Sequence, residues 1–273
     1  MKILVTGTKG FIGKQLLIRL SLENDNDVLG IDDKYMLGNW KENINRVLQY
    51  ANPEVIFHVG ACSDTLEQDV NYMMVRNYES TKLLADWCKN NKDKRMIYSS
   101  SAANYGANGE HPSNLYGWSK YVAEDYVLSA GGIALRYFNV DGPGEQNKGK
   151  MSSFLYQAYQ KVKKNQEVLL FPQKPTRDFV YIKDVVAANI HAMNAYDQNK
   201  DRYYEVSTSV SSSFEDVLNL AEIEYTYTTK NCIPEGYQFY TCGDNSKWMR
   251  GWSPEFSLAR GVKEYIGFLG EQK

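Results

Sequence analysis

Tyr116 and Lys120 are four residues apart and follow the serine run 99–101 in the chain. Positions i and i+4 share one face of an α-helix, so we expect Lys120 beside the Tyr116 phenol. The lysine charge would lower the pKa of that phenol from about 10 toward the working pH, as a general base requires. Together with a serine hydroxyl, this set is suited to moving a hydride between a nicotinamide and an alcohol or ketone.

The spacing alone is weak, because the chain contains 21 tyrosines and repeats the Tyr–Lys interval elsewhere. The other pairs are Tyr78/Lys82, Tyr159/Lys163 and Tyr196/Lys200. We interpret those pairs as ordinary contacts on helix surfaces. Tyr116 differs because it follows a strand-like run at 95–101, in a chain that also carries a glycine-rich turn.

The glycine-rich turn lies near the N-terminus. An apolar run at 1–6 enters the motif Gly7-Thr8-Lys9-Gly10-Phe11-Ile12-Gly13, and a helical pattern follows. Gly7 permits the tight turn, Gly10 lets the backbone approach a pyrophosphate, and Gly13 allows close packing of helix on strand. The start of the helix offers N–H groups and a positive dipole end to phosphates. This arrangement predicts a dinucleotide site that includes Phe11 and Ile12.

A second strand is expected at 27–32, and its terminal Asp32 lies about twenty residues past the glycines. Its carboxylate is placed to accept hydrogen bonds from the adenosine ribose hydroxyls. Asp33 adds a second negative charge that would repel a 2′-phosphate. NAD is therefore favoured over NADP, although Lys34 could offset this charge.

The elements that must position these residues alternate along the first half of the chain. Strands are expected at 1–6, 27–32, 54–58, 94–99 and 133–136, and helices at 39–51, 69–90 and 115–129. This order predicts an α/β fold with a Rossmann-type doubly wound parallel sheet and a ligand at the carboxyl ends of the strands. Small residues at such ends would make room for a cofactor: Gly60, Ala61, Cys62 and Ser63.

Beyond residue 142 the alternation loosens. Helices are expected at 152–164, 182–196, 214–223 and 257–269, with short strands between them. We predict a dinucleotide-binding domain at 1–142. Residues 143–273 would form a smaller C-terminal substrate-binding lobe, interleaved with the last elements of the sheet.

Composition describes an ordinary globular enzyme, with 43% hydrophobic and 23% charged residues and a net charge of −2. That charge favours neither nucleic acid nor a membrane surface as a partner. The N-terminus enters a strand directly, without a signal peptide, so a cytoplasmic protein is expected. The cysteines and histidines form no metal-ligand spacing, so no metal is expected.

Taken together, these residues resemble the extended short-chain dehydrogenase/reductase superfamily, which acts largely on nucleotide-sugars. The matching motifs are Thr6-Gly7-x-x-Gly10-Phe11-Ile12-Gly13, Asn77-x-x-Ser80-Thr81, Ser99-Ser100-Ser101-Ala102-x-x-Tyr105-Gly106, the Tyr116–Lys120 pair, Arg136-Tyr137-Phe138-Asn139-Val140 and Arg177-Asp178-Phe179-Val180-Tyr181. Further motifs resemble the ADP-glyceromanno-heptose 6-epimerase family: Phe57-His58-x-Gly60-Ala61-Cys62-Ser63, Tyr72-Met73-Met74, Lys148-Gly149-x-Met151 and Tyr237-Gln238-x-x-Thr241. The likeness runs along the whole chain.

The resemblance implies a nucleotide-sugar epimerase that keeps NAD or NADP tightly bound, forms a homo-oligomer and serves lipopolysaccharide biosynthesis. Its catalytic residues would be Ser101, Tyr116, Lys120 and Lys148, with Lys148 as a second base. The cofactor would further contact Asn77 and Val140. The nucleotide-diphosphate sugar would contact Ser63, Ser101, Asn139, Lys148, Gln157, Phe171, Arg177 and Tyr237.

The proposed chemistry inverts one carbon centre through a transient ketone, and the ketone turns over between oxidation and reduction. Because one base serves only one orientation of the ketone, Lys148 would serve the other, in a neutral form favoured by desolvation or a neighbouring cation. An exposed loop charge is an alternative interpretation of Lys148. An ion pair with Asp178 is an alternative for Arg177.

Several departures from the family pattern leave the substrate open. The chain passes from Asp33 almost directly to a helix, without the usual third strand, and the loop at 106–114 is short. A 4-epimerase acting on a UDP- or GDP-sugar, or a reductase, could use the same scaffold. A dehydratase is disfavoured because Ala102 and Ala103 replace its Asp-Glu pair. A non-catalytic NAD(P)-sensing protein is disfavoured by the intact Ser101, Tyr116 and Lys120.

Overall fold

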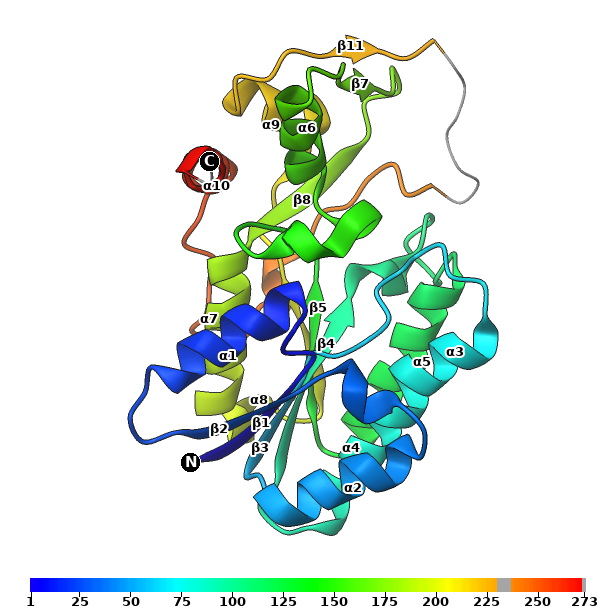
Figure 1. The fold of residues 1–273 in the computed structure, drawn as a ribbon, viewed down its shortest axis with the longest axis vertical. Coiled ribbons are helices and arrows are strands. Elements are labelled where there is room, and N and C mark those ends of the chain that lie inside the picture. Colours follow the sequence, from blue (N-terminus) through cyan, green and yellow to red (C-terminus); the bar gives the residue numbers. More distant parts are fainter. Residues whose placement is uncertain (230–236, 272–273) are drawn as a thin grey trace.

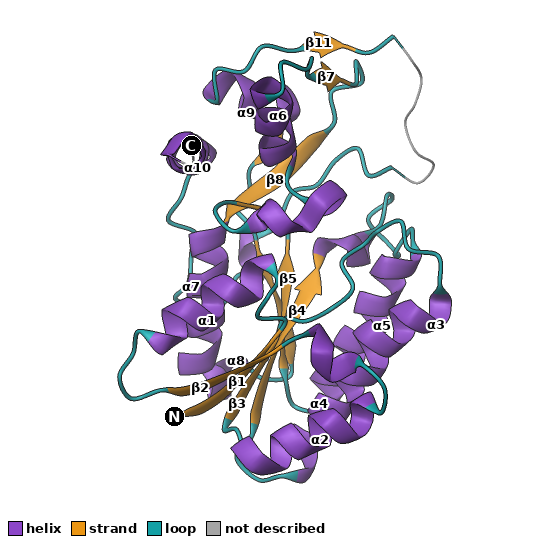
Figure 2. Cartoon of the chain, viewed as in Figure 1, coloured by secondary structure: helices purple, strands orange, loops and turns teal. Residues whose placement is uncertain are grey.

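The computed structural model describes residues 1–229 and 237–271. Its centre is a six-stranded parallel sheet in the order β2-β1-β3-β4-β5-β9 (Figures 1 and 2). The strands are β1 (Lys2–Thr6), β2 (Asp27–Ile31), β3 (Val55–His58), β4 (Arg95–Ser101), β5 (Ile133–Tyr137) and β9 (Arg202–Val206). The predicted doubly wound parallel sheet is confirmed.

Two helical layers cover the sheet. One layer contains α1 (Phe11–Ser21) and α7 (Ile182–Asn194); the other contains α2 (Trp40–Ala51), α4 (Ser80–Asn90) and α5 (Leu115–Ser129) (Figure 1). Neighbouring strand residues face opposite layers, since Ile97 packs in the core under α1 and α7 while Tyr98 packs in the core under α4 and α5. The inner strands β1, β3, β4 and β5 are almost fully buried on both faces, which explains their continuous apolar runs.

The helix predicted at 69–90 is present and uninterrupted from Val70 to Asn90, but it contains a π-helical turn: α3 (Val70–Met74) is followed by the turn at Val75–Glu79 and then by α4. Asp69 begins it as the N-cap, with its carboxylate accepting a hydrogen bond from the Tyr72 N–H at 2.9 Å. The extra residue of a π turn redirects side chains, and such turns are common at functional sites.

The second half of the chain adds smaller sheets and helices above the strand ends. The sheets consist of β6 (Asn139–Asp141), β8 (Thr176–Tyr181) and β10 (Ser211–Ser213) in the order β10-β8-β6, and of β7 (Leu169–Leu170) with β11 (Thr226–Tyr227). The helices there are α6 (Phe154–Lys163), α9 (Phe214–Leu220) and α10 (Leu258–Glu271). The short α8 (Tyr196–Asn199) instead lies at the amino ends of β4 and β5, where the Tyr196 hydroxyl accepts a hydrogen bond from the Met96 N–H and donates to the Gly131 carbonyl. Because β9 returns to the first sheet, the two halves interleave. The division at residue 142 stays a prediction.

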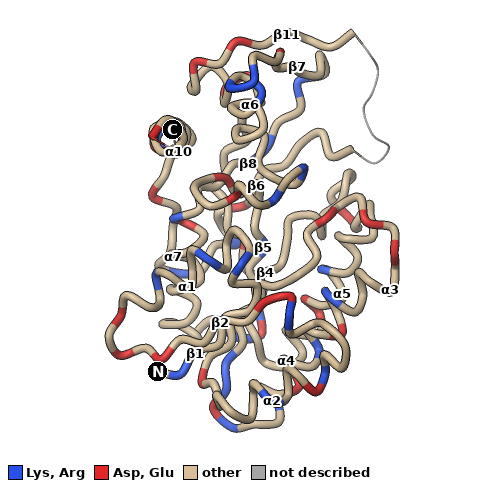
Figure 3. Tube along the Cα trace, in the orientation of Figure 1, with Lys and Arg blue, Asp and Glu red and all other residues tan. Residues whose placement is uncertain are grey.

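β2 is the edge strand of the large sheet, and the chain leaves it through a 3₁₀ turn at Asp33–Met36 directly into α2. Lysines and arginines are interspersed with acidic residues along the described chain (Figure 3). Within the described residues, no helix is long and apolar enough to span a bilayer.

Candidate active site

A cleft of about 700 Å³ lies at the carboxyl ends of the central strands. Its lining includes most residues predicted from the sequence: Gly7, Gly10, Phe11, Ile12, Gly13, Asp32, Asp33, Gly60, Ala61, Ser63, Ser101, Tyr116, Lys120, Asn139, Val140, Lys148, Gln157, Arg177 and Tyr237. A larger hollow of about 1080 Å³ between α6 and α9 contains none of them. The cleft is therefore the candidate active site.

The glycine turn shapes one end of the cleft. Gly7 has a φ of +71°, and a Cβ there would lie 2.6 Å from the Cα of Gly60. A Cβ on Gly13 would lie 2.3 Å from the Gly7 carbonyl oxygen, so α1 can approach β1 only if residue 13 is glycine. Gly10 is the N-cap of α1 and makes no side-chain cap, which leaves the first N–H groups of the helix to a ligand. A dinucleotide pyrophosphate fits this cradle.

Asp32 and Asp33 lie at the end of β2, and each has a cationic neighbour. Asp32 is 3.6 Å from the Lys9 ammonium, and Asp33 accepts a hydrogen bond from Arg76 at 2.6 Å. Lys34, the cation expected from the sequence to offset them, instead lies over the Tyr35 ring. No motif or spacing in the sequence indicates Arg76, which comes from the π turn forty-three residues after Asp33.

The Tyr116 phenol near the start of α5 and the Ser101 hydroxyl at the end of β4 line the same cleft and interact electrostatically. Burial raises the pKa of the Tyr116 phenol, and the Ser101 contact opposes this effect. The expected lowering of that pKa is therefore wrong as a net effect, because desolvation of the phenol dominates.

Lys120 is only 3% exposed, and its Nζ lies 4.3 Å from the centre of the Tyr98 ring. Burial lowers the pKa of this ammonium to about 7, against the opposing effect of Glu124 one turn later. The lysine thus carries its proton only part of the time near neutral pH. The contact between Tyr98 and Lys120 was not predictable from the sequence, because the packing of α5 against β4 and β5 is what brings the ring beside the ammonium.

Lys148 follows β6 and lines the same cleft, 5.2 Å from the centre of the Phe11 ring. Burial lowers the pKa of its ammonium, while the nearby Glu145 carboxylate opposes this. Of the two causes expected for a neutral lysine, the structure supplies desolvation. The charged neighbour is an anion and not a cation. The alternative of an exposed loop charge does not describe this side chain, which is mostly buried.

Arg177 is 7% exposed and lies against the rings of Phe214 and Tyr237, with its guanidinium carbon 5.0 Å from the Tyr237 ring centre. Burial lowers the pKa of this guanidinium. The alternative of an ion pair with Asp178 is wrong, because strand alternation points Asp178 to the other face, where it accepts hydrogen bonds from Thr208 and Gly243. No carboxylate of the described residues forms an ion pair with Arg177.

Three predicted contacts do not line the cleft: Cys62, Asn77 and Phe171. Asn77 accepts a hydrogen bond from the Cys62 N–H at 2.8 Å and donates to the Cys62 carbonyl at 3.0 Å, so it holds the cleft wall from behind. Asn77 also donates to Ser119 of α5. Phe171 packs edge-on against Tyr237 and supports that ring. All three were assigned to the site from sequence motifs. A motif indicates which part of the fold a residue belongs to, but not where its side chain points.

Fold and cleft together define an enzyme of the dinucleotide-binding α/β class. The chain belongs to the NAD dependent epimerase/dehydratase family, whose model matches residues 3–207. The ADP-L-glycero-D-manno-heptose-6-epimerase of Brachyspira hyodysenteriae is 33% identical, over 98% of this chain and 97% of that protein. The resemblance found in the sequence motifs is confirmed.

Solved structures agree. The Helicobacter pylori ADP-L-glycero-D-manno-heptose-6-epimerase has a TM-score of 0.82 and 28% identity, covering 98% of this chain and 96% of that chain. The UDP-glucose 4-epimerase of Thermotoga maritima, solved with UDP-glucose, has a TM-score of 0.85 and 24% identity, covering 99% of both chains. This second likeness concerns the fold alone.

Proposed function

We propose that this protein is a nucleotide-sugar epimerase that inverts a carbinol centre of an ADP-heptose through a transient ketone. One observation carries the proposal: a single cleft combines the Ser101–Tyr116 pair with a second, desolvated basic group, Lys148, from a separate element. A one-base reductase has no need of the second group. The similarity to heptose epimerases supports the choice of substrate.

NAD is the cofactor we propose, held with its pyrophosphate at the uncapped start of α1 and its adenosine ribose at Asp32. Bound NAD would supply reversible hydride transfer at the reacting carbon of the substrate. Lys9 and Arg76 partly neutralise Asp32 and Asp33, so the discrimination against a 2′-phosphate is moderate and not absolute. Ala61 and Val140 line the path between these ends.

Tyr116 takes the proton from the reacting hydroxyl, and Ser101 holds the same oxygen by a hydrogen bond. The buried phenol is a poor base until a positive charge approaches it, because burial raises its pKa. Lys120 supplies that charge when protonated, and Glu124 favours its protonated form. The pair is thus tuned by a lysine that is itself close to half-protonated at neutral pH.

Lys148 protonates and deprotonates the oxygen when the ketone presents its other face. Desolvation favours its neutral form, which a base needs. Arg177 anchors the diphosphate, since a buried guanidinium that pairs with no carboxylate of the described residues is suited to a phosphate. Asn139, Tyr237 and Ser63 complete the sugar and nucleotide contacts, with Gln157 beside them.

The test is a panel of ADP-, GDP- and UDP-sugars, incubated with the protein and followed by NMR. Interconversion of an ADP-heptose between its C6 epimers, without net reduction of added NAD, supports the proposal. Inversion at C4 of a UDP-sugar would instead assign the 4-epimerase activity. We also propose a cytoplasmic homo-oligomer that supplies lipopolysaccharide biosynthesis.

A further inference from the structure

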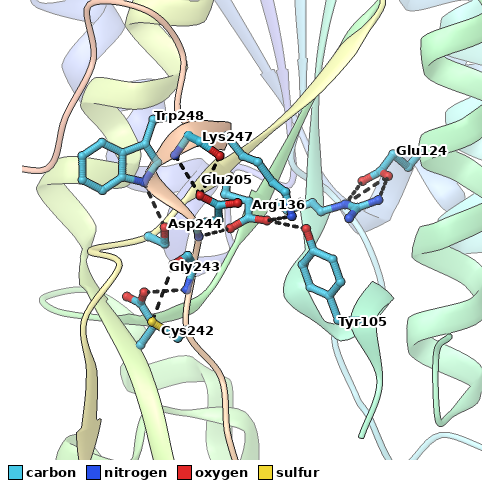
Figure 4. Close-up of polar contacts among 12 residues, drawn as sticks. Tyr105, Glu124, Arg136, Glu205, Cys242, Gly243, Asp244, Lys247 and Trp248 are labelled. Atoms are coloured by element: carbon cyan, nitrogen blue, oxygen red, sulfur yellow. Dashed lines mark hydrogen bonds and ion pairs between the residues drawn. The ribbon is translucent and has the colours of Figure 1, made fainter. Parts of the chain in front are cut away.

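A buried polar network connects the catalytic helix to the segment that carries Tyr237 (Figure 4). It begins at Glu124 of α5, where the carboxylate receives two hydrogen bonds from the Nε of Arg136, at 2.9 and 3.1 Å, and a third from its Nη2. The Arg136 guanidinium is held between two aromatic rings, those of Tyr105 and Tyr203, at 4.7 and 3.6 Å from the ring centres.

The network continues from Tyr105 to Glu205 of β9. The Tyr105 hydroxyl donates to the Glu205 carboxylate, which is 2% exposed. That carboxylate also accepts the Asp244 N–H at 2.7 Å and lies 3.2 Å from the Lys247 ammonium. Glu205 therefore ties the turn after β4 to residues 237–248, which we name the return segment.

The return segment contributes to the substrate end of the cleft. Tyr237 lines the cleft and covers the Arg177 guanidinium. Gln238 donates to the Gly106 carbonyl at 2.7 Å, a second tie to the turn that follows Ser101 and Tyr105. The anchoring end and the reacting end of the cleft thus meet at Tyr105–Gly106, four and five residues after Ser101.

We propose that the Tyr105–Glu205 contact is a positioning device, which fixes the distance between the Ser101–Tyr116 pair and the Arg177–Tyr237 anchor. The inference rests on the proposed function of the cleft. A nucleotide-sugar binds well only if the two ends of the cleft keep the distance that separates its diphosphate from its reacting carbon. Loss of the contact lets the anchor drift while the cofactor site, built from β1 and α1, is untouched.

The structure offers a matched pair of variants. Tyr105→Phe keeps the ring against Arg136 and removes the hydroxyl, while Glu205 retains Asp244 and Lys247 as partners, so the carboxylate stays compensated and the fold should survive. Tyr203→Phe keeps the other ring and removes a hydroxyl that has no hydrogen-bond partner among the described residues. Gln238→Met removes the second tie at a partly exposed position.

Each variant is characterised by KM and kcat with the turned-over nucleotide-sugar, by the Kd for NAD, and by hydrogen–deuterium exchange across the return segment. Tyr105→Phe should raise KM about tenfold, the worth of a hydrogen bond to a charged group, with kcat changed less than about twofold. NAD affinity should stay constant, and amides of the return segment should exchange faster. Gln238→Met should raise KM by a smaller factor, and Tyr203→Phe should change nothing.

An unchanged KM in both Tyr105→Phe and Gln238→Met overturns the inference, as does a fall in kcat at constant KM. If the wild-type protein turns over no nucleotide-sugar, the proposed function fails, and calorimetry with ADP under saturating NAD takes the place of KM. A weaker ADP affinity in Tyr105→Phe than in Tyr203→Phe then supports the positioning contact. Equal affinities reject it.

Discussion

The Lys120 ammonium lies 4.3 Å from the centre of the Tyr98 ring and lines the same cleft as the Tyr116 phenol. Lys120 and Tyr98 are almost fully buried. A cation over an aromatic face is stabilised by the ring quadrupole, but this attraction is too small to offset full desolvation, which lowers the lysine pKa to about 7. A titrating lysine at the base of the site has measurable consequences for stability.

The first prediction concerns the stability of the cofactor-free protein against pH. The pKa of Lys120 is about 7 in the folded state and about 10.4 when unfolded. Between these values the unfolded state binds more protons than the folded state. The destabilisation caused by burying the charged Lys120 is therefore complete below about pH 7 and decreases as the pH rises toward 10. Lys120→Met should therefore exceed wild type in unfolding free energy at pH 6, by a margin that shrinks toward pH 10.

Urea unfolding at pH 6, 8 and 10 measures this margin, and the surface variant Lys89→Met provides the control. Lys89 is exposed on α4, so its replacement should give a difference that does not vary with pH. A constant margin for Lys120→Met over the whole range would show that this ammonium does not titrate near neutrality.

The second prediction concerns the base. Tyr116→Phe should fold and retain cofactor, but its turnover should fall by at least roughly a hundredfold, the usual worth of a positioned acid/base. Tyr121→Phe, an exposed position on the same helix, should keep normal turnover. Steady-state kinetics on the NMR-identified substrate decides this, and near-normal turnover in Tyr116→Phe would remove the catalytic assignment.

The strand and helix order was predictable from the sequence because short continuous apolar runs alternate with period-3.6 apolar patterns in the first half of this chain. The helix at 115–129 matches α5 residue for residue, since Asn114 caps it with a hydrogen bond to the Gly117 N–H. The π turn at Val75–Glu79 was not predictable, because neither a proline nor a glycine marks the extra residue in the sequence.

The site residues were likewise predictable only in part. Motif positions found the strand ends, and therefore the cleft, but not the direction of each side chain. Asn77 turns back onto Cys62, and Arg76 beside it pairs with Asp33 across forty-three residues. The partners of Lys120 and Arg177 depend on packing between elements, which a one-dimensional pattern does not contain.

The third prediction concerns cofactor choice. If Asp32 accepts hydrogen bonds from the ribose hydroxyls, the purified protein should retain NAD in preference to NADP, and Asp32→Ala should narrow the difference between the two Kd values. Calorimetry on cofactor-stripped protein measures both constants. NADP bound in the purified wild-type protein would show that Lys9 and Arg76, which pair with the two carboxylates, dominate the electrostatics of this end.

The fourth prediction distinguishes an epimerase with two bases from a reductase-like enzyme with one. If Lys148 serves the second orientation of the ketone, Lys148→Ala should bind substrate with nearly unchanged KM and interconvert epimers far more slowly. With Tyr116 as the base, the substrate would still exchange a hydride with bound NAD in the first orientation of the ketone. Bound cofactor would then be partly reduced although no epimer is formed. Lys164→Ala, at an exposed position just beyond α6, serves as the control and should behave as wild type.

The contrary result has a distinct signature. Removing a charge that only anchors phosphate weakens ground state and transition state equally, which raises KM and leaves kcat largely intact. The burial of Lys148 argues for the base, because desolvation favours the neutral form that can accept a proton, whereas an anchor needs the charged form. A raised KM with unchanged kcat in Lys148→Ala would therefore demote this lysine to an anchor, and Tyr116 would be left as the only assigned base.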